Sequence, residues 1–450
     1  MKKYLFIIGI AAAMFAACSS SEDVLSQDGA ELIDEENVTR EDLMGDVPIE
    51  FAGIDGTASV EQTRGSASVE GVFKSGKMGI YCIAEKKINN AAENLKMSGS
   101  STALGKILNT WLENVSAHVE PASNGKGLVT WDNPEEKHYY PKSDWYAYSF
   151  AAYHPWSKYT YMTENAVAVY IPIDGNDDVF TAIAETPRVI AGSATDALAY
   201  SQSYFEAVSQ GNYDNITTEH KPYYKFKNLT SRLKFKVKLK SDCERELHVD
   251  SICFSDYPNI MKIGLAKYDN GNLINHWYSY NFVTNYSDFM PPSLKADLPH
   301  KTITVNGQQV DACVVNGHFW LREADDTSIG EKVNGQYKYV LNSSDYTEVG
   351  DCIMMPPVYK GHTKSTIKLE VYLADNYGNK FTTDLPLELP APDPDPNDPN
   401  DKGGWKAATS YTIKVSIGGN IFFMDQTRGQ MTGQLDGYDE DNTHVYEVSD

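Results

Sequence analysis

The sequence predicts a mainly β protein. Its 450 residues include 29 tyrosines, and short runs in which apolar residues alternate with polar ones recur along most of the chain. Aromatic and β-branched side chains pack well on a pleated sheet, and alternation turns one face of a strand towards a core. A hydrophobic content of 41% is enough for such cores, and the length favours two domains.

The chain begins with the pattern of a signal peptide. Lys2 and Lys3 precede an apolar run, Tyr4–Phe15, that ends just before two alanines and Cys18. This run is too short to span a bilayer as a stable helix. We therefore predict a signal peptide over residues 1–17. Cys18 directly follows it, either as a residue with a function of its own or by chance behind an ordinary signal peptide.

Residues 18–47 are strongly acidic. They hold ten Asp and Glu side chains against a single base, Arg40. Because such a segment buries too little apolar surface to fold alone, we predict a tether.

The first predicted domain covers residues 48–221. Strands are expected at Ile49–Ile54, Lys77–Ala84 and Asn165–Ile173. We expect one or two short helices in the chain. One is predicted at Thr102–Val115, because five apolar residues fall there at helical spacing. They are Leu104, Ile107, Leu108, Trp111 and Leu112.

The second predicted domain covers residues 222–417. In Leu233–Leu239 apolar side chains alternate with lysines, so one face is buried and the other meets water. Residues 365–389 predict a hairpin with its turn at 375–379. Other strands are expected at His248–Phe254, Asp311–Leu321, Tyr337–Leu341, Cys352–Tyr359 and Ser410–Ile417.

Residues 390–404 are rich in proline and acid. Their acidic and amide side chains superficially resemble a calcium-binding loop, but alternating prolines favour extended backbone and no glycine makes the sharp turn. We predict a stiff surface loop, with calcium binding as the alternative. The side chains concerned are Asp393, Asp395, Asn397 and Asp398.

Residues 418–450 form a C-terminal tail with two short apolar pieces. Ile421–Met424 and Val445–Val448 are separated by a mostly polar stretch, which we expect to be flexible. Neither piece has an expected partner strand beside it in the sequence.

Charge and motif content exclude several classes of function. A net charge of −23 disfavours nucleic acid and anionic lipid surfaces. The ten histidines are dispersed, and the sequence contains no nucleophile elbow, phosphate-binding loop or dinucleotide fingerprint. We therefore predict that the protein is not an enzyme and has no catalytic residues, cofactor or metal site.

Two groups of residues leave alternatives open. Five cysteines follow Cys18 without a CxxC pair, and we expect most to be buried, with one disulfide as the alternative. They are Cys82, Cys243, Cys253, Cys313 and Cys352. Five tyrosine and tryptophan residues at 145–156 predict either a core strand that runs into a surface turn or a sugar-stacking platform. They are Trp145, Tyr146, Tyr148, Tyr153 and Trp156.

Several segments together resemble one family. The residues "FAAC" before and at Cys18 resemble a bacterial lipobox, and the acids behind them resemble a surface-export signal of Bacteroidetes lipoproteins. In their order, the segments 49–82, 144–156, 223–239 and 403–417 resemble the fimbrillin family of Bacteroidales.

The resemblance implies two transthyretin-like β-sandwich domains in tandem and a structural role in a type V fimbria, or pilus, that contributes to adhesion. It implies acylation of Cys18, which anchors the protein to the cell outer membrane, exposed at the surface. The implied partners are other fimbrial subunits. The alternative function is a surface glycan-binding lipoprotein or a pilus tip adhesin.

The resemblance also implies processing by an arginine-specific protease. Removal of an N-terminal strand opens a groove, which a strand from a neighbouring subunit fills. A cut after Arg64 releases the expected strand Ile49–Ile54 together with the lipid. A cut after Arg40, the alternative, frees the lipid and leaves the strand in place. A third possibility is that neither arginine is cut.

The tail supplies the candidate donor strand. Val445, Tyr446 and Val448 are favoured, with Ile421, Phe422 and Phe423 as the alternative. Either piece could instead complete its own C-terminal sheet, and the acidic stretch Asp436–Asp441 could oppose tight insertion. The rank of the subunit as stalk, anchor or tip therefore stays open.

Overall fold

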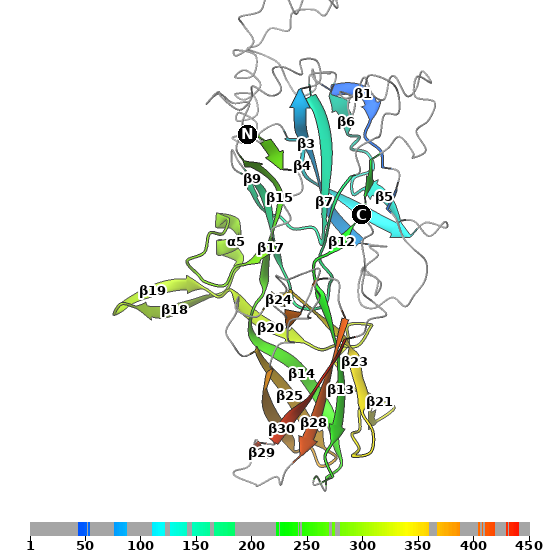
Figure 1. Cartoon of the computed structure of the whole chain (residues 1–450), viewed down its shortest axis with the longest axis vertical. Coiled ribbons are helices and arrows are strands. Elements are labelled where there is room, and N and C mark those ends of the chain that lie inside the picture. Colours follow the sequence, from blue (N-terminus) through cyan, green and yellow to red (C-terminus); the bar gives the residue numbers. More distant parts are fainter. Residues whose placement is uncertain are drawn as a thin grey trace, which may run out of the picture.

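In a computed structural model, the part of the chain that the structure describes is mainly β-sheet (Figure 1). The mainly β fold predicted from the sequence is confirmed. The residues that the structure describes are 44–51, 53–54, 76–87, 110–121, 127–141, 146–162, 166–184, 222–224, 226–241, 243, 245–269, 272–274, 280–359, 367–387, 404–405, 407, 410–418, 429–430 and 432–440.

An eight-stranded sheet lies in the upper part of Figure 1. Its order is β11-β2-β5-β4-β3-β7-β10-β12, and only β11 and β2 are parallel to each other. A buried cluster that includes Met78, Phe150 and Tyr224 packs against it. The strands are β2 (Gly53–Ile54), β3 (Gly76–Lys87), β4 (Thr110–Pro121), β5 (Gly127–Trp131), β7 (Tyr146–His154), β10 (Phe180–Ile183), β11 (Tyr223–Tyr224) and β12 (Lys227–Asn228). A separate pair consists of β1 (Met44–Pro48) and β6 (Tyr139–Pro141).

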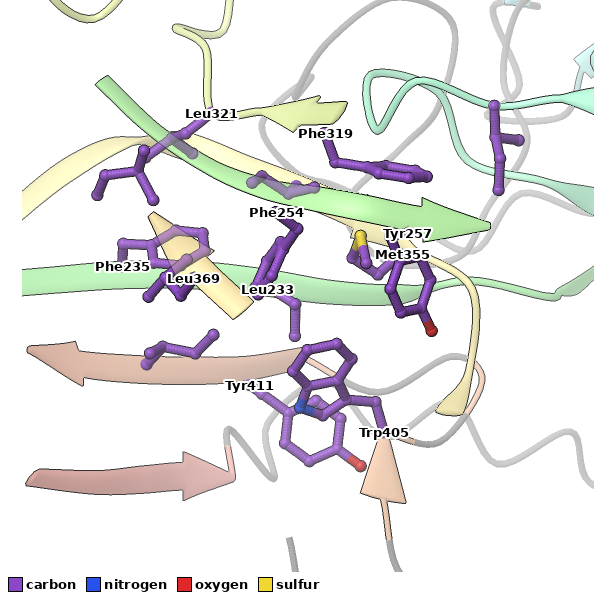
Figure 2. Packing of buried hydrophobic residues seen from close by; sticks show 14 of the residues in the cluster. Leu233, Phe235, Phe254, Tyr257, Phe319, Leu321, Met355, Leu369, Trp405 and Tyr411 are labelled. Atoms are coloured by element: carbon purple, nitrogen blue, oxygen red, sulfur yellow. The ribbon is translucent and has the colours of Figure 1, made fainter. Parts of the chain in front are cut away.

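Two further sheets form a sandwich in the lower part of Figure 1. Their orders are β23-β13-β28-β30 and β20-β14-β25-β26-β29. Figure 2 shows their core, where the ring of Phe235 lies 6.1 Å from that of Phe254, and Trp405 packs on Phe254 at 5.6 Å. The strands are β13 (Ser231–Leu239), β14 (Leu247–Pro258), β20 (Asn316–Trp320), β23 (Thr347–Met355), β25 (Ile367–Asp375), β26 (Lys380–Leu387), β28 (Ser410–Gly418), β29 (Gly429–Gln430) and β30 (Thr432–Glu440).

A fourth sheet crosses the boundary predicted between the two domains. Its order is β16-β15-β9-β8, and β17 also pairs with β15. Strand β9 precedes residue 222 and β15 follows it, and they pair from Ile260 opposite Pro172 to Lys267 opposite Ala166. The strands are β8 (Tyr159–Met162), β9 (Ala166–Pro172), β15 (Ile260–Asp269), β16 (Asn272–Ile274) and β17 (Tyr280–Phe282). The predicted division at residues 221 and 222 stays a prediction.

Smaller elements lie outside these four sheets. A hairpin of β18 (His300–Val305) and β19 (Gln308–Cys313) projects from the side of the molecule (Figure 1). One short helix, α5 (Pro292–Asp297), precedes it. The remaining pairs are β21 (Lys332–Val333) with β22 (Gln336–Tyr337), and β24 (Val358–Tyr359) with β27 (Gly404–Trp405).

Most strands expected from alternation are confirmed. In β13 every second residue is buried, as the lysine alternation predicts. The hairpin expected at 365–389 is β25 and β26, which pair from Ile367 opposite Leu387 to Ala374 opposite Lys380. The strands expected at 77–84, 165–173, 248–254 and 410–417 correspond to β3, β9, β14 and β28.

The helix predicted over Thr102–Val115 is wrong for its last six residues, which belong to β4. The register between β3 and β4 shifts near Leu112, and Asn114 takes a positive φ of 51°. Such a bulge interrupts the alternation of two and leaves apolar residues three apart, which imitates a helix in the sequence. Residues 102–109 lie outside the described part of the chain.

Described strands also lie at both ends of the predicted body. Strand β1 begins at Met44, inside residues 18–47, and within the expected strand Ile49–Ile54 the described strand residues are Gly53 and Ile54. The tail stretch expected to be flexible contains β30, paired with β28 from Thr432 to Glu440. Backbone pairing stabilises a polar strand that its composition does not reveal.

We predict that Phe235→Ala lowers the free energy of unfolding by about 3–5 kcal/mol, because it empties a site between the two sheets of the sandwich. The matched control is Tyr377→Ala, whose ring is 92% exposed and which we expect to change stability by less than about 0.5 kcal/mol. Urea denaturation measures both, and equal effects would contradict the packing in Figure 2.

A buried carboxyl group lies where the upper and lower sheets meet. Asp178 accepts a hydrogen bond from the Thr230 hydroxyl at the start of β13, and Arg232 nearby pairs with Asp351 at 3.6 Å. Burial raises the pKa of Asp178 from 3.8 to about 6, although Thr230, Asn228 and Arg232 oppose the shift. Between about pH 4 and pH 6, the Asp178 carboxyl group is therefore protonated in the folded protein and ionised in the unfolded chain.

We predict that Asp178 makes stability fall as pH rises from about 4 to about 6, because the folded state binds more protons than the unfolded state in that window. Asp178→Asn removes this slope, which amounts to about 3 kcal/mol over two pKa units. Buried His154, whose pKa is lowered to about 4, contributes the opposite slope in both proteins and cancels in the comparison. Urea midpoints at pH 4, 5, 6 and 7 measure the effect. Identical pH profiles for the two proteins would contradict the prediction.

Candidate functional site

The first candidate site holds the N-terminal segment, which we define as residues 44–54. Strand β1 runs antiparallel to β6, with Met44 opposite Pro141 and Pro48 opposite Tyr139. Beyond it, the Ile49 amide donates a hydrogen bond to the His138 carbonyl at 2.7 Å. Strand β2 then lies between β11 and β5. The segment is thus held by backbone pairing at both of its ends.

Phe51 anchors the middle of the segment. Its side chain is 7% exposed, and its ring stacks on Tyr224 at 5.3 Å with 25° between the planes. The rings of Trp131 and Phe150 pack against it in edge-to-face geometry, with 5.3 Å and 5.8 Å between ring centres. Three aromatic walls around one ring account for a large apolar contact area and favour edge and offset geometries.

The walls of this site come from distant parts of the chain. Trp131 belongs to β5, Phe150 to β7 and Tyr224 to β11, and β11 reaches β2 by parallel pairing of Tyr223 with Gly53. The N-terminal segment thus covers these rings and pairs with the backbone of β5, β6 and β11.

The second candidate site holds the C-terminal tail. Strand β30 pairs antiparallel with β28, from Tyr411 opposite Glu440 to Gly418 opposite Thr432, and is the last strand of its sheet. Just before it, β29 pairs parallel with β26, with Gly429 opposite Phe381. The tail therefore lies along one edge of the sandwich and closes both sheets. An edge strand is the part of a sheet that exchanges most readily.

The residues predicted for lipidation, cleavage and strand donation lie outside the described part of the chain. These are Cys18, Arg40, Arg64, Ile421, Phe422, Phe423, Val445, Tyr446 and Val448. Their order along the chain relative to the strands is nevertheless known. Arg40 precedes β1, whereas Arg64 falls between β2 and β3. A cut after Arg64 therefore separates the N-terminal segment from the rest of the protein.

The aromatic cluster at 145–156 includes a core residue. Tyr153 is fully buried, and its hydroxyl shares its one hydrogen between two acceptors, Asn114 Oδ1 at 2.5 Å and the Ser157 carbonyl at 2.9 Å. Burial raises the pKa of Tyr153 well above its ordinary value. Trp156 lies half-buried beneath Lys77 Nζ at 4.5 Å. Trp145 and the side chains of Tyr146 and Tyr148 lie outside the described residues.

The other predicted features can be placed only where the structure describes them. Among the described residues no group of three His, Cys, Asp or Glu side chains could hold a metal ion, and no helix is long and apolar enough to cross a membrane. No disulfide joins the five described cysteines, four of which are buried and one, Cys243, half-buried. The loop 390–404 lies outside the described part except for Gly404, which begins β27.

Sequence reasoning missed the residues that hold the N-terminal segment. Tyr224 and Phe150 fall only within the segments 223–239 and 144–156 that carry the family resemblance, and Trp131 was not singled out. Parallel pairing between strands about 170 residues apart leaves no local signal, so the three walls could not have been brought together from periodicity.

Comparison with solved structures gives overlaps along most of the chain. A candidate cell adhesion protein from Bacteroides ovatus is 11% identical, with coverage of 90% of this chain and 99% of that one and a TM-score of 0.37. Mfa3, a tip fimbrial protein from Porphyromonas gingivalis, is 10% identical, with 84% and 96% covered and a TM-score of 0.28. The anchor protein Mfa2 from the same organism is 9% identical, with 89% and 99% covered and a TM-score of 0.23. The sequence matches no family model and no curated protein.

We predict that Phe51→Ala loosens the N-terminal segment, because it removes the ring enclosed by Trp131, Phe150 and Tyr224. A buried Phe→Ala change costs about 3–5 kcal/mol, which corresponds to a roughly 100-fold or greater increase in local opening. Hydrogen exchange at the Ile49 amide should therefore accelerate, while exchange in β28 stays unchanged. The same acceleration in Tyr377→Ala, or none in Phe51→Ala, would show that the ring does not hold the segment.

Proposed function

We propose that this chain is a structural subunit of a type V fimbria, which assembles when a strand of one subunit replaces the N-terminal segment of another. One observation carries the proposal. The segment 44–54 is bound through Phe51 and backbone pairing, yet its only covalent link to β3 is the stretch that contains Arg64. Cleavage there converts an internal part of the fold into a dissociable ligand.

The two ends of the chain then have complementary roles. Loss of the segment leaves aromatic side chains and unpaired backbone exposed, and an extended strand restores both kinds of contact. The donor comes from the tail, 418–450, whose described strands pair only at the edges of the sandwich. Val445–Val448 is the favoured donor and Ile421–Met424 the alternative.

The N-terminal residues supply transport and attachment in this proposal. Acylated Cys18 holds the precursor at the surface of the outer membrane, since several acyl chains make a durable anchor where one is marginal. Cleavage after Arg64 by an arginine-specific protease removes the lipid and the segment together. Cleavage after Arg40 removes the lipid alone and leaves the groove filled.

Brief trypsin treatment of the purified precursor tests the proposal. We expect a discrete product that begins at Gly65 and then forms a ladder of oligomers on a gel. Arg64→Ala should prevent both results, whereas the matched variant Arg40→Ala should prevent neither. Measurement is by N-terminal sequencing and gel electrophoresis without boiling.

The role of the tail is tested in the same experiment. A chain truncated after Glu440 keeps β29 and β30 but lacks Val445–Val448, so it should be cut at Arg64 and remain monomeric. If the full-length cut protein also stays monomeric at high concentration, assembly by strand exchange is wrong.

A further inference from the structure

Three aromatic rings lie side by side on the outer face of one sheet of the sandwich. Trp320 is 37% exposed, and His318 stacks on it with 6.0 Å between ring centres and 26° between the planes. The Tyr372 ring lies 5.9 Å from that of Trp320, with 39° between the planes. We call these three residues the aromatic face. They are distinct from the aromatic cluster at 145–156.

Strand pairing explains why the rings face away from the core. His318 and Trp320 are two residues apart on β20, so they share a face, while Phe319 between them is fully buried in the core. Trp320 lies opposite Cys253 on β14, and Cys253 lies opposite Glu370 on β25. Small Cys253 separates the tryptophan from the carboxylate and leaves space between them for larger neighbouring side chains.

Glu370 fixes the polar groups beside the rings. Its carboxylate accepts hydrogen bonds from the Tyr372 hydroxyl at 2.6 Å, the Lys368 ammonium at 2.8 Å and the Ser255 hydroxyl at 2.7 Å. Burial opposes its ionisation, but these three donors outweigh burial and lower the pKa of Glu370 to about 2. The carboxylate therefore stays charged at neutral pH and holds Tyr372 and Lys368 in position.

The charges on this surface restrict what it can bind. Lys368 also contacts Asp384 at 3.0 Å, so its ammonium is shared between two carboxylates. An acidic ligand would meet this carboxylate pair on a chain of net charge −23. An apolar protein partner would have to bury Lys368 and Asp384, each 49% exposed, although interface centres are depleted of such charges.

A neutral sugar chain satisfies both parts of the surface. The C–H face of a pyranose ring is apolar and packs on an aromatic ring, while its hydroxyls need hydrogen-bonding groups at the edge. On the same face of the sheet, His318 beside Trp320 and the Lys368–Asp384 pair beside Glu370 supply such groups.

We propose that the aromatic face, with Lys368 and Asp384, binds a neutral glycan through stacking on Trp320 and Tyr372. This binding is separate from subunit assembly, because the aromatic face lies on neither of the two candidate assembly sites. It is a property of the uncut chain.

Affinity gel electrophoresis of the uncut protein tests the proposal. The probes are dextran, yeast mannan, xylan and arabinogalactan, each cast into a native gel, with alginate as an acidic comparison. We expect retardation by at least one of the four neutral probes and none by alginate. Trp320→Ala should weaken that binding about tenfold or more, and Trp320→Phe should keep part of it.

Tyr377→Ala is the matched control, because it removes an aromatic ring that is 92% exposed in the turn between β25 and β26, outside the aromatic face. It should bind like the unaltered protein, and the thermal midpoint of each variant shows whether it is folded. No retardation by any neutral probe, equal loss in Tyr377→Ala, or full binding in a folded Trp320→Ala variant would each overturn the proposal. So would a Trp320→Ala effect on self-association in place of glycan binding.

Discussion

The whole molecule depends on the way one stretch of chain serves two sheets. Strand β14 ends at Pro258 and β15 begins at Ile260, so only Asn259 separates a sandwich strand from a strand of the sheet that crosses the domain boundary. The Asn259 carbonyl accepts a hydrogen bond from the Ile173 amide at 2.8 Å, and its amide donates to the Val315 carbonyl at 3.2 Å. Both backbone groups of the connecting residue are satisfied, which fixes the connection in a single conformation.

This shared stretch explains why one of the three buried clusters among the described residues spans both parts of the molecule. One cluster of buried residues runs from Tyr81 and Tyr153 in the upper sheet to Phe235 and Ile417 in the lower sandwich. Two independent domains joined by a linker would each close their own core. Here the sheet that contains β9 and β15 links packing under the upper sheet to packing within the lower sandwich. The N-terminal segment lies outside this cluster, and β30 is the last strand of its sheet.

The sequence reveals the parts of this fold that rest on local pattern. Alternation in 233–239 and 367–373 predicts β13 and β25 because one face of each strand is buried and successive side chains change sides. The same rule fails at Asn114, where a bulge changes the alternation, and in β30, where backbone pairing forms a strand from polar residues. The N-terminal site was predicted as a removable strand, but the rings that hold Phe51 come together through long-range pairing, which no local pattern encodes.

The mixed pairing of β2 has a consequence for the direction of any fibre. One neighbour, β11, runs parallel to β2, while the other, β5, runs antiparallel to it. The two neighbours therefore present different patterns of amides and carbonyls, and a replacing strand matches both only when it runs the same way as the strand it displaces. Successive subunits joined in this manner would share one orientation, so that the filament has two chemically different ends and grows as a polar structure.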